Sequence, residues 1–149
     1  MAHTFTSLFT HLIFSTKQRA PILRTDIRPR LFDYMGGMIR NMDGTSVLIN
    51  GTEDHVHILT VMPSTKALSD FMRDLKGDSS GWAKSTLGVA DFGWQTGYAA
   101  FSVSKSNVEA VRKYIEEQEE HHRRRPFQEE YLQFLKRHEI EFDERFVFD

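Results

Sequence analysis

Two short apolar runs with four turn residues between them constrain the fold more than any other feature of the sequence. The runs are TSVLIN at 45–50 and HVHILTVM at 55–62, and the connecting residues at 51–54 are GTED. Apolar, β-branched runs on either side of a short Gly-containing segment predict a β-hairpin. Pro63 follows the second run and is expected to end that strand, because proline has no N–H to donate. The sequence therefore predicts a hairpin over 45–62.

The sequence on either side of the hairpin predicts two more strands and two helices. A run at 5–14 and a run at about 99–103 have the composition of strands. Apolar residues at helical spacing predict one helix before the hairpin and one after it. These residues are Ile27, Leu31, Tyr34, Met35, Met38, Ile39 and Met42 in the first helix and Leu68, Phe71, Met72, Leu75 and Trp82 in the second.

Cap signals locate the starts of helices. Thr25 or Asp26 is expected to cap the first helix. In the last third of the chain, the capping box from Ser106 to Glu109 predicts the start of a third helix. Pro126 suits the first turn of a fourth helix, and the apolar tail after it is expected to dock. The order is β-α-β-β-α-β followed by two helices. This predicts an α+β, ferredoxin-like antiparallel sheet with helices on one face and extra C-terminal helices.

Composition indicates a globular protein with one domain over residues 1–149. Hydrophobic residues make up 40% and charged residues 27%, and the net charge of -2 does not by itself indicate a nucleic-acid binder. Cysteine is absent, which excludes disulfides and thiolate ligands. No apolar run is long enough for a membrane span, and the first residues lack the order of a signal peptide. We therefore expect a cytoplasmic protein.

His55 and His57 lie two residues apart on a predicted strand, so their side chains share a face. Their Cα atoms are roughly 6 to 7 Å apart, and two imidazoles at that spacing can converge on one metal ion. Leu59 continues the same face, so we expect that face to be covered. The alternative is a pair of hydrogen-bonded histidines in a half-exposed sheet. A metal site needs a third ligand, for which His11 is a candidate, whereas His121, His122 and His138 are expected at the surface.

The predicted third helix supplies further candidates. Ala110, Tyr114 and Gln118 form a stripe at i, i+4 and i+8, so Tyr114 and Gln118 can face one site. A glutamine offers an oxygen ligand and a tyrosine offers a hydroxyl nucleophile. The alternative is an amphipathic helix whose tyrosine packs at an edge.

Taken together, these segments closely resemble one family over nearly the whole chain. EDHVHIL, LSDFMRDLKGDSSGW, WQTGYAAFSVS and VEAVRKYIEEQEEHH are similar to segments of the single-tyrosine HUH transposases of the IS200/IS605 type. That group includes the tyrosine transposases associated with repetitive extragenic palindromes. The resemblance implies that His55, His57 and Gln118 bind a metal ion and that Tyr114 is the nucleophile.

The resemblance also implies an activity. Members of the family use Mg²⁺ or Mn²⁺ to cleave and rejoin single-stranded DNA near hairpins through a 5′-phosphotyrosine link. They work as homodimers in which the tyrosine helix can serve the partner's histidines. A free tyrosine has a pKa of about 10, so it is a weak nucleophile at neutral pH without help.

DNA contacts are predicted from charge and aromaticity alone. Lys17, Arg19, Lys76, Arg112 and Lys113 are candidates for phosphate contacts, which carry most of the affinity. Ser79 and Ser80 are candidate phosphate donors, and Trp94 is a candidate for base stacking, whereas Trp82 is expected in the core. Two other functions stay open on the sequence. One is a ferredoxin-like nucleic-acid-binding module without chemistry, and the other is a protein in which metal only stabilises the fold.

Overall fold

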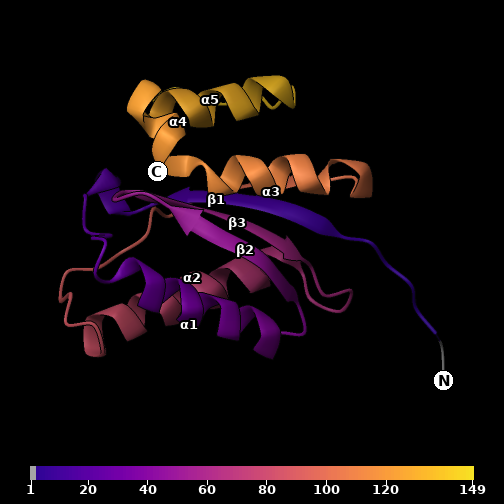
Figure 1. Cartoon of the computed structure of the whole chain (residues 1–149), viewed down its shortest axis with the longest axis horizontal. Coiled ribbons are helices and arrows are strands. Elements are labelled where there is room, and N and C mark those ends of the chain that lie inside the picture. The colour runs from indigo at the N-terminus through magenta and orange to yellow at the C-terminus, as the bar shows by residue number, and fades with distance from the viewer. Residues whose placement is uncertain (1–2) are drawn as a thin grey trace.

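A four-stranded antiparallel sheet lies at the centre of the computed structural model, which describes residues 3–149 (Figure 1). The strands are β1 (Phe9–Ser15), β2 (Thr45–Gly51), β3 (His55–Val61) and β4 (Ala99–Ser102). They are ordered β2-β3-β1-β4 across the sheet. The predicted hairpin is β2–β3, and β1 lies between β3 and β4. The predicted α+β class and the ferredoxin-like element order are confirmed.

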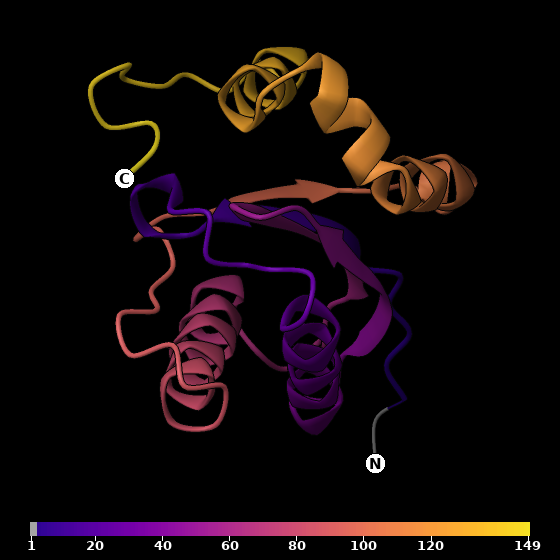
Figure 2. The same cartoon turned by 60° about the vertical axis from the view of Figure 1, so that its left-hand side comes forward.

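Helices cover both faces of this sheet (Figures 1 and 2). On one face lie α1 (Arg28–Asn41) and α2 (Leu68–Ser85). On the other lie the last three helices, α3 (Val108–Glu116), α4 (Gln118–Arg124) and α5 (Phe127–Arg137). Short 3₁₀ turns at η1 (Lys17–Arg19) and η2 (Lys105–Asn107) follow β1 and β4. The predicted helices on one face and the extra C-terminal helices are therefore both present.

Side chains of β3 point alternately to the two faces of the sheet, so each helical layer packs against a different set of them. Val56 and Ile58 are fully buried in the main apolar core with residues of α1 and α2. Leu59 packs instead with Val108 and Ile115 of α3. Because alternate side chains of a strand point to opposite faces, His55 and His57 lie on the Leu59 side, beneath α3, α4 and α5. The expectation that the histidine face is covered is confirmed.

The first strand is shorter than predicted. β1 begins at Phe9 rather than at Phe5, which is 91% exposed. Phe9 pairs with Val61, the last residue of β3, and Pro63 follows soon after. Only Leu8 continues the pairing, because its carbonyl accepts from the Met62 N–H at 3.0 Å, and β3 offers no partner to the residues before it.

The predicted caps of two helices are wrong. The residue before α1 is Ile27, and neither Thr25 nor Asp26 caps the helix with its side chain. The Asp26 carboxylate instead binds the guanidinium of Arg24 at 3.1 Å. Ser106 does not cap α3, because the 3₁₀ turn at 105–107 delays the helix to Val108 and the Ser106 hydroxyl meets that of Ser104.

The C-terminal tail docks on the body of the protein, as predicted. Phe142, Val147 and Phe148 pack against an apolar cluster formed by β1, β4 and α5. The carbonyl of Asp149 accepts hydrogen bonds from the backbone N–H of Gly97 and the side chain of Gln95.

Within residues 3–149, no helix combines the length and the apolar character that crossing a membrane requires.

Candidate active site

His55 and His57 are fully buried and project from β3 toward the layer of C-terminal helices. Their rings lie 5.2 Å apart between centroids and are nearly perpendicular. The Nε2 atom of His55 is 3.2 Å from Oε1 of Gln118, and Nε2 of His57 is 2.8 Å from Oε1 of Glu130. Both Nε2 atoms therefore turn toward the same small volume, which residues of α4 and α5 close.

Gln118 reaches this volume through a break in the predicted helix. The sequence predicted one helix carrying Tyr114 and Gln118, but α3 ends at Glu116 and α4 begins at Gln118. Glu117 joins them with φ −97° and ψ 24°. Gln118 is fully buried, and its amide nitrogen donates to the backbone carbonyl of Tyr114 at 3.3 Å. The two side chains thus approach one site as predicted, but from two short helices.

Glu130 of α5 was not identified from the sequence. It is 2% exposed, and its Oε1 atom lies 2.8 Å from His57 Nε2, 3.2 Å from His122 Nε2 and 3.9 Å from His55 Nε2. The Tyr114 hydroxyl donates a hydrogen bond to the other carboxylate oxygen, Oε2. One signal was available. Glu130 lies three residues after Phe127 and four before Phe134, so it is a charged residue within an apolar helix stripe.

The surface prediction for His122 is wrong. Its side chain is 12% exposed, and its ring centroid lies 4.2 Å from that of His55. His122 follows Gln118 by four residues, which places the two on one side of α4. His138, in contrast, is exposed as predicted. His121 is half-buried and stacks on the Tyr114 ring with centroids 4.4 Å apart.

Polar neighbours hold the Nδ1 atoms of His55 and His57. His11, the candidate third ligand, is one of these neighbours and does not lie beside the other donors. Its Nε2 atom lies 2.8 Å from Nδ1 of His57, on the far side of that ring. Nδ1 of His55 lies 2.8 Å from the Asp54 carboxylate and 3.0 Å from the Thr52 hydroxyl. Metal-binding histidines commonly have such partners, which fix the ring orientation and leave the other nitrogen for the ion.

These donors fit a metal ion. His55, His57, His122 and Glu130 each offer one ligand atom, and the four atoms lie within 4.8 Å of one another. Three imidazole nitrogens and a carboxylate oxygen, with the amide oxygen of Gln118 beside them, form a mixed donor set that suits divalent transition metals. The cluster can therefore hold a divalent cation.

Burial and hydrogen bonds shift the protonation equilibria of the site. Burial opposes the charge of Glu130, but hydrogen bonds from His122 and His57 outweigh it and hold the Glu130 pKa far below its usual range. Burial lowers the pKa of His57 to about 4. For Tyr114, burial and then the neighbouring Glu130 charge raise the pKa well above its usual value. The site thus holds neutral His57, ionised Glu130 and protonated Tyr114 at neutral pH.

Residues 4–118 match the family model for IS200-like transposases. The chain belongs to this family. The match ends at Gln118, so the additional donors His122 and Glu130 lie beyond it.

Individual relatives agree with this assignment. The transposase is 27% identical over 115 residues to the ISDra2 transposase TnpA of Deinococcus radiodurans, covering 72% of this chain and 81% of the relative. A crystal structure of a putative transposase from the same organism superposes with a TM-score of 0.64 at 23% identity, over 79% of this chain and 95% of the other. A REP-associated tyrosine transposase bound to a REP hairpin superposes with a TM-score of 0.54 at 14% identity. The superposition covers 77% of this chain and 66% of the other. Both superpositions support the fold.

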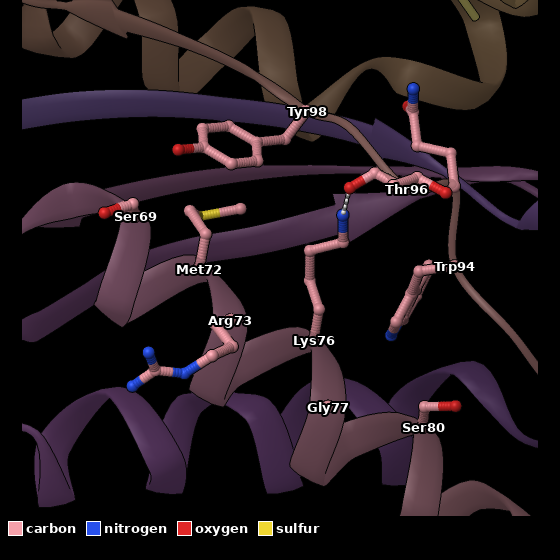
Figure 3. A pocket seen from close by; sticks show the side chains of 10 residues that line it. Ser69, Met72, Arg73, Lys76, Gly77, Ser80, Trp94, Thr96 and Tyr98 are labelled. Carbon is pink, nitrogen blue, oxygen red and sulfur yellow. Dashed lines mark hydrogen bonds between the residues drawn. The ribbon is translucent and has the colours of Figure 1, made fainter. Parts of the chain in front are cut away.

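Lys76, a predicted DNA contact of the transposase, lies on α2 beside a cavity of about 400 Å³ (Figure 3). Its ammonium donates to the backbone carbonyls of Thr96 and Gly97 at 3.0 and 2.7 Å. Burial lowers its pKa to about 8. Lys76 therefore holds the loop before β4 in place, and its contact with DNA stays a prediction.

The structure contradicts two other predicted contacts near this loop. Trp94 is 8% exposed and packs at nearly right angles to the rings of Phe14 and Phe92, so too little of its ring is exposed for a base to stack on it. Its indole N–H donates to the hydroxyl of Ser79, which is fully buried. Ser79 and Trp94 hold α2 against the loop before β4 rather than reaching for DNA. Trp82 packs against the core and stacks on Tyr34, as predicted.

The other four predicted phosphate contacts lie on two elements. Lys17 and Arg19 belong to η1 and line a cavity of about 550 Å³ with Phe148 of the tail. Arg112 and Lys113 lie on α3, where Arg112 pairs with Glu116 at 3.3 Å. Their role in DNA binding stays a prediction.

Proposed function

We propose that this transposase cleaves and rejoins single-stranded DNA beside hairpins, with Tyr114 as the nucleophile. One observation carries the proposal. The Tyr114 hydroxyl and the His57 imidazole bind the two oxygens of one buried carboxylate, that of Glu130. A nucleophile is therefore held next to a cluster that can bind a cation, as phosphodiester cleavage requires.

His55, His57 and Gln118 would hold a divalent ion, Mn²⁺ or Mg²⁺, with His122 and Glu130 as adjoining ligands. The nitrogen donors favour Mn²⁺, which binds imidazole more tightly than the oxygen-seeking Mg²⁺ does. When bound, such an ion supplies positive charge that neutralises the scissile phosphate and favours the tyrosinate.

The residues of the chain account for the remaining steps. Glu130 orients the Tyr114 hydroxyl through this hydrogen bond, and the phenolic proton passes to water as the tyrosine oxygen attacks phosphorus. The P–O3′ bond breaks, the departing oxygen takes up a proton to become a 3′-OH, and a 5′-phosphotyrosine link remains. Since this link conserves the phosphodiester bond energy, a later 3′-OH can reverse the attack and join strands without ATP.

Hairpin recognition is proposed from family membership. The REP-associated relative is bound to a REP hairpin, and we propose that a hairpin marks the cleavage site for this chain as well. Phosphate contacts from Lys17, Arg19, Lys76, Arg112 and Lys113 remain part of the proposal.

We also propose a homodimer, on the family resemblance. In the single chain, Tyr114 approaches the histidines of its own subunit. In a dimer, Tyr114 could serve the histidines of its own subunit or those of the partner subunit. Mixing the inactive variants Tyr114→Phe and His57→Ala distinguishes these two arrangements. Recovered cleavage in the mixture would establish sites shared between subunits, and none would place each site within one subunit.

The direct test uses a denaturing gel. Wild type and Tyr114→Phe are incubated with Mn²⁺ and labelled single-stranded hairpin DNA taken from the genomic flanks of the gene. The wild type should give a protein-linked DNA band, and Tyr114→Phe should give none while retaining DNA affinity. Hairpins that bind tightly yet give no linked band with the wild type would favour the alternative of a binding module without chemistry.

A further inference from the structure

A small pocket of about 200 Å³ adjoins Tyr114. Its walls come from α3, α4 and α5, and it shares Glu130 with the four-donor cluster. The volume is below the range of about 300–1,000 Å³ that is typical of sites for drug-sized ligands. It suits a chemical group the size of a phosphate.

Arginine side chains dominate the charge of this pocket. Arg124, Arg125 and Arg137 line it, and Glu130 is the only acidic residue in its lining. Three guanidinium groups and one carboxylate leave a formal charge of about +2. Among the ion pairs of residues 3–149, Arg125 and Arg137 have no carboxylate partner. The Arg125 guanidinium instead donates to the amide oxygen of Gln133, which is neutral.

His121 forms one wall of the pocket. Its ring stacks on Tyr114 and lines the pocket. Its Nε2 atom is buried and has no hydrogen-bond partner among the described residues, and the nearest carboxylate oxygen, from Glu117, is 3.8 Å away. Because this nitrogen has almost no accessible surface, it does not face the pocket, and His121 contributes the wall that its ring forms beside Tyr114.

We propose that Arg125 and Arg137 form a binding pocket for a backbone phosphate of the DNA strand that Tyr114 attacks. This deepens the proposed function and rests on it. Arginine suits the role, because its planar guanidinium can donate two parallel hydrogen bonds to phosphate oxygens. The pocket fixes the strand on the Tyr114 side, while the histidines and Glu130 hold the metal on the other.

The test measures affinity for fluorescein-labelled dT15 by fluorescence anisotropy, with metal chelated so that no cleavage occurs. Arg125→Gln and Arg137→Gln should each bind about tenfold more weakly than wild type at fixed salt, because each loses a charge-assisted hydrogen bond. Arg123→Gln is the matched control. It removes the same charge from α4, but Arg123 is 73% exposed, pairs with Glu120 and does not line the pocket. Its affinity should change less than twofold.

Two further measurements identify the ligand as one phosphate. The double variant should lose less affinity than the product of the single losses, because both arginines hold the same group. Wild type and Arg125→Gln should bind dT15 with uncharged methylphosphonate linkages equally weakly. Inorganic phosphate should compete with dT15 only at far higher concentration, which separates a strand site from a site for the free ion.

Several outcomes would overturn the pocket. Equal losses for Arg123→Gln and Arg125→Gln would indicate a diffuse basic surface, and a tenfold loss on the methylphosphonate strand would indicate a contact to bases. Circular dichroism of each variant checks folding, and Arg125→Lys should recover part of the affinity. Because chelator is present, these results stand apart from the proposed chemistry. The proposed chemistry would fail separately, if the wild type bound hairpin DNA but formed no link between Tyr114 and DNA in the presence of Mn²⁺.

Discussion

The two faces of the sheet are built from different chemistry. The face under α1 and α2 buries aliphatic and aromatic side chains, among them Leu12, Ile58 and Phe71. The face under α3, α4 and α5 buries His11, His55, His57, Gln118 and Glu130 within an apolar surround. Both layers are close-packed, but only the second has side chains that can bind a cation or attack a phosphate.

This difference separates stability from chemistry on the two faces of one sheet. Burying apolar surface stabilises the fold without regard to direction, whereas buried polar groups cost free energy unless each finds a partner. The α1–α2 face can therefore anchor the sheet, and the opposite face can carry a hydrogen-bonded cluster that a purely apolar core would exclude. Four measurements test this division, from the largest expected effect to the smallest.

Phe71→Ala should lower the free energy of unfolding by about 3–5 kcal/mol, because it removes a fully buried aromatic ring from the α1–α2 face. Urea unfolding followed by tryptophan fluorescence measures this loss. Affinity for Mn²⁺, measured by calorimetry on the folded variant, should stay within twofold of wild type. A large fall in Mn²⁺ affinity would break the separation between the two faces.

Lowering the pH should destabilise the metal-free protein through His57. Its pKa is about 4 in the folded state and near 6.5 when unfolded, so between these values only the unfolded chain gains the proton. The shift corresponds to about 3 kcal/mol of stability that is present at pH 7 and lost as pH falls from 6.5 to 4. Glu130 has a lowered pKa, so its contribution is lost only at still lower pH, below the usual value of 4.5.

Urea unfolding in chelator at several pH values between 4.5 and 7.5 checks this dependence. The slope of the free energy of unfolding against pH should be shallower in His57→Gln, which has no imidazole to titrate at that position. An unchanged slope in this variant would assign the pH dependence to other groups.

His11→Phe should destabilise the protein by about 1–3 kcal/mol, because it leaves Nδ1 of the buried His57 without its partner. Affinity for Mn²⁺ should fall about 10- to 100-fold, because the His57 ring loses the contact that orients it. Calorimetry and urea unfolding measure the two effects. His138→Phe, at an exposed position, is the control and should leave the Mn²⁺ affinity unchanged.

Arg112→Gln should change the free energy of unfolding by less than about 0.5 kcal/mol, because the pair with Glu116 is solvent-exposed. If Arg112 contacts a DNA phosphate, the slope of log affinity against log salt should become shallower by about 0.7. Anisotropy with labelled hairpin DNA at several salt concentrations measures the slope. A wild-type slope in the variant would remove Arg112 from the predicted contacts.

Much of the fold follows from local pattern. The hairpin over 45–61 was predictable because both strands and the turn lie within one short segment. The start of β1 was not predictable in this way. It depends on where the partner strands β3 and β4 end, and the sequence of residues 5–8 carries no information about that. Ser106 failed as a cap for a related reason. The capping pattern is local, but the 3₁₀ turn before α3 decides where the helix begins.

The candidate site divides in the same way. His55, His57, Tyr114 and Gln118 were found from spacing and family resemblance, and the structure brings them together. Glu130 and His122 were missed because their partners lie far away along the chain. A charged residue in the α5 stripe and a histidine four residues after Gln118 were the signals available. Each of the two is equally consistent with a solvent-exposed polar residue until α4 and α5 are placed on the sheet.

The separation of 73 residues between His57 and Glu130 has a consequence for the newly made chain. At synthesis rates of about 5–20 residues per second, the ribosome reaches Glu130 roughly 4 to 15 s after His57. During that interval the histidines exist without the helix that covers them. A metal ion can meet the two imidazoles first and the carboxylate afterwards, so the order of translation sets the order in which the ligands become available.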